Sequence, residues 1–185
     1  MNSYKNEGIV LKKNNLSETD QIVTLFTKDF GKISLLAKGV RRLTSRKRGC
    51  LEVFNQVKFF AIKTKGIDIV TEVDTIKNFF TCRKDLKKIA VAYEITEVVD
   101  KLLAEESEQS DLYYLLIECL LKIQQASLSD VGPVFDFFGK ESLKILGYWP
   151  REQLFPAFFN VGDYIENIIE REIKSRKFLS KILYK

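Results

Sequence analysis

The sequence predicts an α+β protein in which a five-stranded β-barrel precedes an α-helical domain. Up to about residue 75, short apolar segments alternate with turn residues and show the two-residue period of half-buried strands. From about residue 82, apolar residues recur at the three- and four-residue spacing of helices. We therefore expect a barrel domain over residues 1–80 and a helical domain over residues 81–185.

The strands are expected where β-forming residues lie between turn signals. Gly31 follows Lys28-Asp29-Phe30 and can adopt the positive φ of a tight connection, and Thr64-Lys65-Gly66 marks another turn. No helical pattern interrupts these segments, which is typical of a small closed or nearly closed barrel. The expected strands cover residues 7–13, 20–27, 33–37, 51–63 and 67–74.

Helical periodicity predicts a bundle in the second half. The first helix, from Leu86 to Leu102, is apolar over so wide an arc that it must be largely buried. The second follows Ser110, a suitable N-cap, and the third opens at Asp130 and ends at Gly147. For the last helix, expected over residues 160–179, Asn160 with Asp163 resembles a capping box.

The net charge of +5 is unevenly distributed along the chain. Residues 1–80 carry 15 Lys and Arg against 8 Asp and Glu, whereas residues 81–185 carry 15 against 17. The excess is concentrated in residues 38–48, the basic loop, where six cations occur without an acid. Because like charges repel at this density, they are retained more easily when a polyanion neutralises them. The pattern favours nucleic acid as a partner.

The candidate nucleic-acid contacts follow from this pattern, because cations that neutralise phosphates supply most sequence-independent affinity. Tyr4 and Phe60 are candidate stacking platforms for bases, whereas Phe54 and Phe59 are expected in the barrel core. The candidate binding residues are Lys38, Arg41, Arg42, Arg46, Lys47 and Arg48, extended by Lys12, Lys13, Lys58, Lys63 and Lys65.

The absence of histidine excludes Ser-His-Asp and Cys-His catalysis and any metal site that uses imidazole. No glycine-rich nucleotide-hydrolysis loop occurs. Cys50, Cys82 and Cys119 are far apart, which suits reduced thiols in the cytosol and gives no zinc half-site. No apolar run is long enough to span a membrane, and the first residues lack a signal-peptide core. We expect a cytoplasmic, non-enzymatic protein without a cofactor or bound metal.

An ordered series of motifs occupies residues 8–54. It runs from Gly8-Ile9-Val10-Leu11 through Ser17-Glu18-Thr19-Asp20 and Gly31-Lys32-Ile33-Ser34-Leu35-Leu36-Ala37-Lys38-Gly39-Val40-Arg41-Arg42 to Leu51-Glu52-Val53-Phe54. This series resembles the opening of the RecO family. In the helical half, Leu146-Gly147-Tyr148-Trp149-Pro150 resembles the family's Leu-Gly-Tyr-x-Pro turn.

The resemblance implies an OB-fold barrel, binding of single- and double-stranded DNA, and annealing of complementary strands. It implies as partners RecR and the C-terminal tail of the single-strand-binding protein, with RecA loaded indirectly, in a bacterial, nucleoid-associated repair process. An acidic tail needs a cation beside an apolar pocket, for which Arg83, Lys84, Lys87 and Lys88 are candidates. Many relatives hold zinc with cysteine pairs after the turn, but residues 151–158 contain none here, so we expect no zinc.

Two other interpretations stay open. A cationic barrel also suits an RNA-binding OB-fold protein of the translation machinery, and affinity for DNA against RNA of the same sequence would separate the two. The chain could instead be a protein-interaction module whose basic loop serves only solubility. We expect Arg41→Glu with Arg42→Glu to weaken DNA binding and annealing without unfolding the protein, which would exclude the interaction module.

Overall fold

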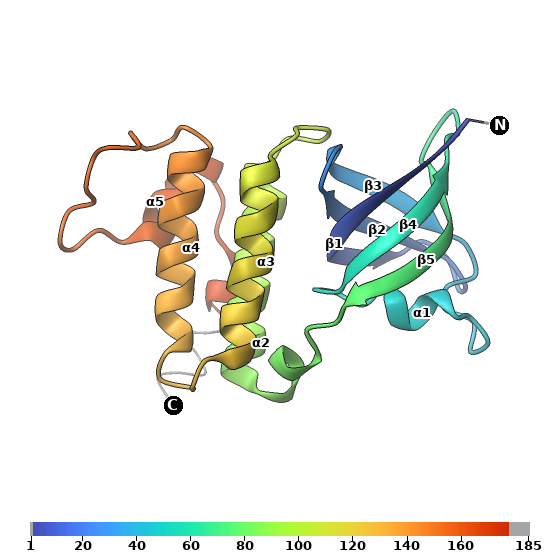
Figure 1. Cartoon of the computed structure of the whole chain (residues 1–185), viewed down its shortest axis with the longest axis horizontal. Helices are drawn as coiled ribbons and strands as arrows, with labels where there is room; N and C mark the ends of the chain where they lie inside the picture. The colour runs from blue at the N-terminus through green and yellow to red at the C-terminus, as the bar shows by residue number, and fades with distance from the viewer. Residues whose placement is uncertain (1, 178–185) are drawn as a thin grey trace. The chain divides into compact units, whose positions relative to one another are not determined.

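The computed structural model describes residues 2–177 and contains a β-barrel followed by helices (Figure 1), which confirms the predicted α+β class. Contacts within the chain define two compact units. The barrel unit comprises the residues up to Asn78 together with Leu103–Ser110, and the helical unit comprises Phe79–Leu102 together with the residues from Asp111 onward. The short segment Leu103–Ser110 therefore belongs with the barrel, although helices flank it in the sequence.

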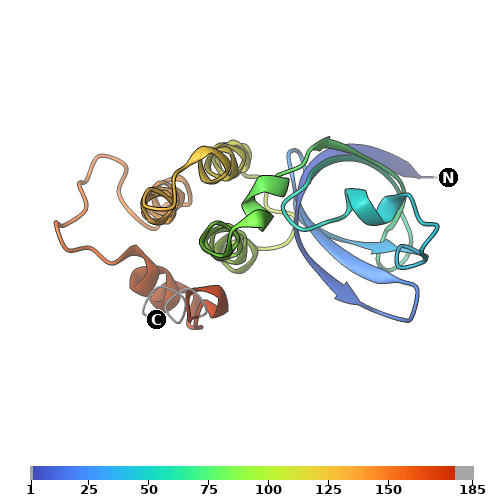
Figure 2. The same cartoon turned by 90° about the horizontal axis from the view of Figure 1, so that it is seen from below.

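The strands form a closed barrel in the order β1-β2-β3-β5-β4, visible as a ring in Figure 2. They are β1 (Ser3–Asn15), β2 (Gln21–Thr27), β3 (Gly31–Ala37), β4 (Gln56–Ile62) and β5 (Ile69–Lys77). The long β1 pairs with β4 through its first half and with β2 through its second half, both antiparallel. Parallel closure between β3 and β5 rests on one pair, Leu36 with Ile69. This is the strand order of an OB-fold, as the resemblance implied.

The expected strand over residues 51–63 is too long at its start. A short helix, α1 (Lys47–Cys50), ends the basic loop, and β4 begins only at Gln56. Phe54 has φ 75° and donates its backbone N–H to the carbonyl of Val10, which interrupts any regular strand at that point. Leu51 and Phe54 are both almost fully buried, so their apolar side chains fill the core and do not mark a strand.

The first three predicted helices are confirmed, and α2 is buried over most of its circumference, as its wide apolar arc indicated. The helical unit contains a 3-10 turn η1 (Phe80–Lys84) and helices α2 (Leu86–Leu102), α3 (Ser110–Gln125), α4 (Val131–Ile145) and α5 (Val161–Ile169). Gly147, with φ 78°, follows the end of α4. No helix among the described residues has the length and apolar character needed to cross a membrane.

The last helix begins as predicted but ends early. The side chain of Asn160 accepts a hydrogen bond from the backbone N–H of Asp163 at 3.2 Å, which is the expected cap. However, α5 ends at Ile169, because Glu170 adopts the left-handed conformation with φ 52°. The prediction of one helix over residues 160–179 is therefore wrong, and its final residues, Phe178 and Leu179, lie outside the described part of the chain.

A carboxylate from α2 caps the helical turn that follows the end of α5. Glu97 accepts hydrogen bonds from the backbone N–H groups of Lys174 and Ser175 at 3.0 and 2.9 Å. It also pairs with Lys101 at 2.6 Å. Burial alone would raise the pKa of Glu97, but these hydrogen bonds outweigh burial and lower the pKa to about 2. This long-range cap overrides the continuous apolar periodicity of the sequence.

A second carboxylate of α2, Glu94, is buried to 5% exposure. Burial raises the pKa of Glu94 to about 7. Arg176 acts in the opposite direction, while the neighbouring carboxylates of Glu166 and Glu97 add to the increase. Between the ordinary pKa of 4.5 and about 7, the folded protein thus retains a proton that the unfolded chain has released.

We expect Glu94→Gln to stabilise the protein at alkaline pH. Because the folded-state pKa is raised, the stability associated with Glu94 is complete below pH 4.5 and decreases as pH rises through about 7. Glutamine removes the cost of burying the charge, so the free energy of unfolding at about pH 8 should rise by roughly 2 kcal/mol. Urea unfolding at low and high pH measures the free energy of unfolding of the variant, and the exposed Glu152→Gln is the control. An equal effect at both pH values would contradict the titration of Glu94.

Candidate nucleic-acid interface

The basic loop is fixed to the connection between β1 and β2. Gly39, with φ 65°, donates its backbone N–H to the carboxylate of Asp20 at 2.7 Å. This hydrogen bond, supported by the Thr19 hydroxyl, holds the pKa of Asp20 below its usual value. The backbone N–H of Arg41 donates to the carbonyl of Thr19 at 3.0 Å. The two connections are therefore joined at one end of the barrel.

Arg41 differs from the other arginines of the loop. Its Nη1 donates to the carbonyl of Ser17 at 2.8 Å, so the guanidinium helps to hold the two connections together. The side chains of Arg42, Arg46 and Arg48 are exposed and make no ion pair or hydrogen bond to any described residue. These three arginines are available to a ligand, whereas Arg41 has a structural role as well as a charge.

Two other lysines of the candidate set bind within the barrel. The Nζ of Lys47, in α1, donates to the carbonyl of Val70 in β5 at 3.3 Å. Lys13 forms a salt bridge with Glu52 at 2.7 Å. Lys38 and Lys12 are exposed, the first at the start of the basic loop and the second on β1. Lys38 and Arg42 both lie near the carboxylate of Asp20, whereas Lys13 and Lys47 make contacts within the barrel unit.

The remaining candidates lie on β4 and on the connection from β4 to β5. Lys58 is paired in register with Glu7 on β1 and with Asp74 on β5, so acids flank it on both sides. Lys63 lies over the ring of Tyr4 at 5.8 Å from the centroid, and Lys65 is exposed at the tip of the connection. Strand β4 neighbours neither β2 nor β3, and the structure does not bring Lys58 together with the basic loop.

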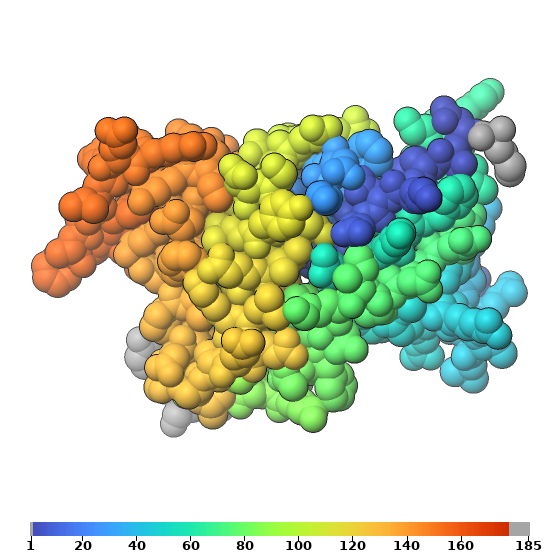
Figure 3. Space-filling view, viewed as in Figure 1, coloured from blue at the N-terminus to red at the C-terminus, as the bar shows by residue number. Residues whose placement is uncertain are grey.

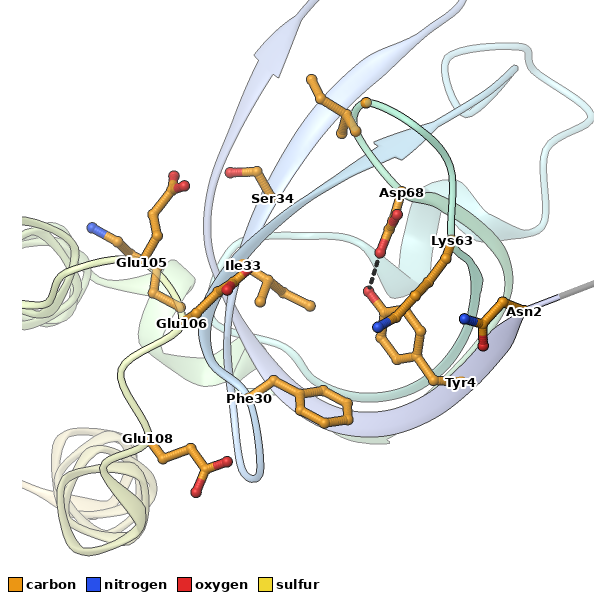
Figure 4. Close-up of a pocket in the computed structure, with 13 residues that line it drawn as sticks. Asn2, Tyr4, Phe30, Ile33, Ser34, Lys63, Asp68, Glu105, Glu106 and Glu108 are labelled. Atoms are coloured by element: carbon orange, nitrogen blue, oxygen red, sulfur yellow. Dashed lines mark hydrogen bonds between the residues drawn. The ribbon is translucent and has the colours of Figure 1, made fainter.

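Among the aromatic candidates, Phe54 and Phe59 are buried in the core, as expected, and Phe60 is half-buried. Tyr4 donates its hydroxyl to the carboxylate of Asp68 at 3.0 Å. It lines a cavity of about 750 Å³ beside β3, drawn in Figure 4. Residues 105–108 form part of the wall of this cavity, and sequence reasoning missed them because they lie about 70 residues from β3 along the chain.

An aromatic cluster holds the turn after α4, where the sequence predicts no zinc site. Trp149 stacks on Phe155 with ring centroids 4.6 Å apart, and Phe159 and Tyr164 complete the cluster at 5.1 and 5.7 Å from the Trp149 ring. The Trp149 indole N–H donates to the carbonyl of Gln153 at 3.1 Å. The segment after the turn projects from the helical unit (Figure 3). Within the described residues, no three His, Cys, Asp or Glu side chains gather as a metal site.

A closed barrel of this strand order, with its basic loop joined to the first connection and helices after the last strand, defines an OB-fold protein with a helical extension. Residues 1–79 match the family model described as Recombination protein O N terminal, and residues 83–153 match Recombination protein O C terminal. Neither model describes a catalytic family. The chain belongs to the RecO family of DNA repair proteins.

Several curated relatives carry the description DNA repair protein RecO. The protein of Caldanaerobacter subterraneus subsp. tengcongensis is 30% identical over 100% of this chain and 78% of its own length. Those of a Nocardioides species and of Bifidobacterium adolescentis are 35% and 34% identical over 80% of this chain. The chain spans only 61% of the length of each of these last two relatives.

Proposed function

We propose that the chain is a recombination mediator that binds single- and double-stranded DNA through the basic loop of its barrel. The exposed and unpaired side chains of Arg42, Arg46 and Arg48 are the observation that carries this proposal. They project from a loop that is hydrogen-bonded to the connection between β1 and β2. OB-folds bind oligonucleotides beside this connection. Lys38 adds a fourth exposed cation.

Annealing of complementary strands is part of the same proposal. A cationic surface that holds two strands lowers their mutual repulsion, and base pairing then decides the register. No catalytic residue is needed for this activity. Family membership supports the further proposal that the chain acts with RecR to load RecA.

Binding to single-stranded DNA should depend strongly on salt. If Lys38, Arg42, Arg46 and Arg48 each neutralise a phosphate, the slope of log K against log salt should be about −3. The six cations counted from the sequence would give about −4, so the structure predicts a shallower dependence. Fluorescence anisotropy with a labelled oligonucleotide at several salt concentrations measures the slope. An RNA of the same sequence serves as competitor, and a slope near zero would contradict phosphate binding by the loop.

We also propose that the acidic tail of the single-strand-binding protein docks beside η1. The Nζ of Lys84 lies 5.1 Å from the ring centroid of Phe80, and both Phe80 and Leu86 are about half exposed. A cation beside exposed apolar side chains is the chemistry that an acidic, apolar tail requires. Lys88 contributes less, because its Nζ donates to the carbonyl of Gln124 at 3.1 Å.

Lys84→Glu should weaken the binding of a synthetic tail peptide by roughly tenfold, because reversal places two like charges together. DNA binding should not change, since the basic loop is intact. Titration of the peptide by calorimetry measures the effect, and Arg151→Glu, an exposed reversal elsewhere in the helical unit, is the matched control. Equal peptide affinity in both variants would place the tail site elsewhere.

A further inference from the structure

The cavity beside β3 is separate from the basic loop and plays no part in the proposed DNA contact. Its volume is about 750 Å³, and all of its lining residues belong to the barrel unit. It lies where β3 and β5 are joined by the single pair Leu36 and Ile69, so β5 leaves the rest of β3 without a strand partner on that side. The segment containing residues 105–108 forms the opposite rim, as Figure 4 shows.

On the side of β3 away from β2, only some of the backbone N–H and C=O groups are hydrogen-bonded. The N–H of Leu36 donates to the carbonyl of Asp68 at 2.8 Å, and the carbonyl of Lys32 accepts from the N–H of Glu106 at 3.0 Å. Alternate residues of a strand direct their backbone groups to the same side. Ser34, between these two residues, therefore directs its N–H and C=O into the gap, and no described strand pairs with it on that side.

Apolar and aromatic side chains line the inner part of the cavity. Tyr4 and Phe30 meet edge to face with ring centroids 5.3 Å apart, and Ile33 lies beside them in Figure 4. Phe30 and Ile67 are 41% and 44% exposed. Exposed apolar surface inside a concave site is typical of a ligand pocket rather than of an ordinary barrel surface.

The rim of the cavity carries an excess of negative charge. Asp68 is held in place by the Tyr4 hydroxyl at 3.0 Å and by the backbone N–H of Thr64 at 2.9 Å. Glu105, Glu106 and Glu108 line the other side and make no side-chain ion pair or hydrogen bond within the described chain. The lining holds four carboxylates and the two lysines Lys32 and Lys63. This balance repels phosphate and attracts a cation.

The acidic rim is built into the fold at a conformational cost. Glu106 has φ 58°, which a residue other than glycine adopts at a cost of about 1 kcal/mol. The bond to the Lys32 carbonyl and the bridge between Lys32 and Glu105 hold the segment in this conformation. Strain of this kind accumulates at binding sites, where the surrounding structure fixes the position of a functional side chain.

We propose that this cavity binds an extended segment of a partner protein that carries a lysine or arginine beside an aliphatic residue. The segment adds a short strand to β3, and its backbone pairs with the N–H and C=O of Ser34. Its cationic side chain lies at the acidic rim formed by Asp68, Glu105, Glu106 and Glu108, and its aliphatic side chain packs on Phe30. An oligonucleotide fits this cavity poorly because the rim would repel its backbone.

A random-peptide phage library selected on the full chain tests the proposal, with excess single-stranded oligonucleotide present to occupy the basic loop. The selected peptides should contain a lysine or arginine next to an aliphatic residue. A synthetic copy of the most enriched peptide should bind the chain and lose affinity by about tenfold or more in Glu105→Lys with Glu108→Lys. Glu152→Lys, an exposed reversal in the helical unit, is the matched control and should leave affinity unchanged. Methylation of the peptide's backbone amides should weaken binding further.

Three results would overturn the proposal. Selected peptides without a basic residue would exclude a cation site, and equal affinity in the double variant and the Glu152→Lys control would place the peptide elsewhere. The third result has two parts: a thymidine oligonucleotide displaces the bound peptide, and it binds the double variant more tightly than the unmodified chain. That result would assign the cavity to DNA. Because the basic loop is intact in every variant, failure of the peptide test leaves the proposed DNA contact unaffected.

Discussion

Simultaneous replacement of Arg42, Arg46 and Arg48 by glutamate should reduce the affinity for single-stranded DNA by at least about a hundredfold at low salt. Each replacement removes a phosphate contact and adds a repulsive charge, so the loss should exceed that of neutral variants. The fold should survive, because the three side chains are exposed and make no ion pair or hydrogen bond to a described residue. Strand annealing should fall together with binding. Gel shift, annealing and circular dichroism on the purified variant measure these outcomes.

Two single variants show whether the loss of DNA binding is specific to the three exposed arginines. Lys58→Glu reverses a charge that lies between Glu7 and Asp74 on a strand remote from the loop, and it should have little effect on DNA. Arg41→Glu should weaken DNA binding and also loosen the loop, because it removes the bond to the Ser17 carbonyl. If the triple variant retained the parent affinity while Lys58→Glu lost it, the contact surface would lie on β4.

Gly31→Ala should destabilise the barrel unit by roughly 3 kcal/mol. Gly31 has φ 65°, a conformation that alanine adopts only with strain. A Cβ at this position would lie 2.2 Å from the carbonyl oxygen of Ser107 and 2.5 Å from its carbonyl carbon, which are backbone atoms with little freedom to move. The Gly31 carbonyl also accepts a hydrogen bond from the Thr27 hydroxyl at 2.7 Å, which opposes a shift of the turn.

Urea unfolding followed by circular dichroism measures this effect. Gly49→Ala is the matched control, because an added Cβ there meets nothing within 4 Å and the residue lies in α1. The control should change the free energy of unfolding by no more than about 0.5 kcal/mol. A Gly31→Ala midpoint equal to that of the control would mean that the segment around Ser107 moves away at little cost. The wall of the cavity beside β3 would then be adaptable.

The order and type of most elements could be predicted because local periodicity carries that information. The alternation in β3 and the wide apolar arc of α2 are local patterns, and both elements form where their patterns lie. The end of α5 was not predictable in this way, since the capping carboxylate of Glu97 comes from a helix more than 70 residues earlier. Nor does periodicity show that Leu103–Ser110 belongs with the barrel, because the bonds that hold it involve β3.

For the candidate site, too, the sequence shows local features but not the contacts that folding creates. The sequence identified the density of cations in residues 38–48, since charge is visible without a fold. It could not separate Arg41 from Arg42, because the carbonyl of Ser17 that engages Arg41 becomes a neighbour only when the barrel closes. The placement of Lys58 between two acids likewise depends on strand register, which a single sequence does not specify.

The aromatic cluster after α4 also gives the molecule an intrinsic optical reporter. Trp149 is the sole tryptophan of the chain, and it stacks on Phe155 within the helical unit. Its emission therefore reports the surroundings of the turn after α4, whereas the barrel contributes only tyrosine emission. Changes in tryptophan intensity on heating or on addition of a ligand can be attributed to this one location without any engineered label.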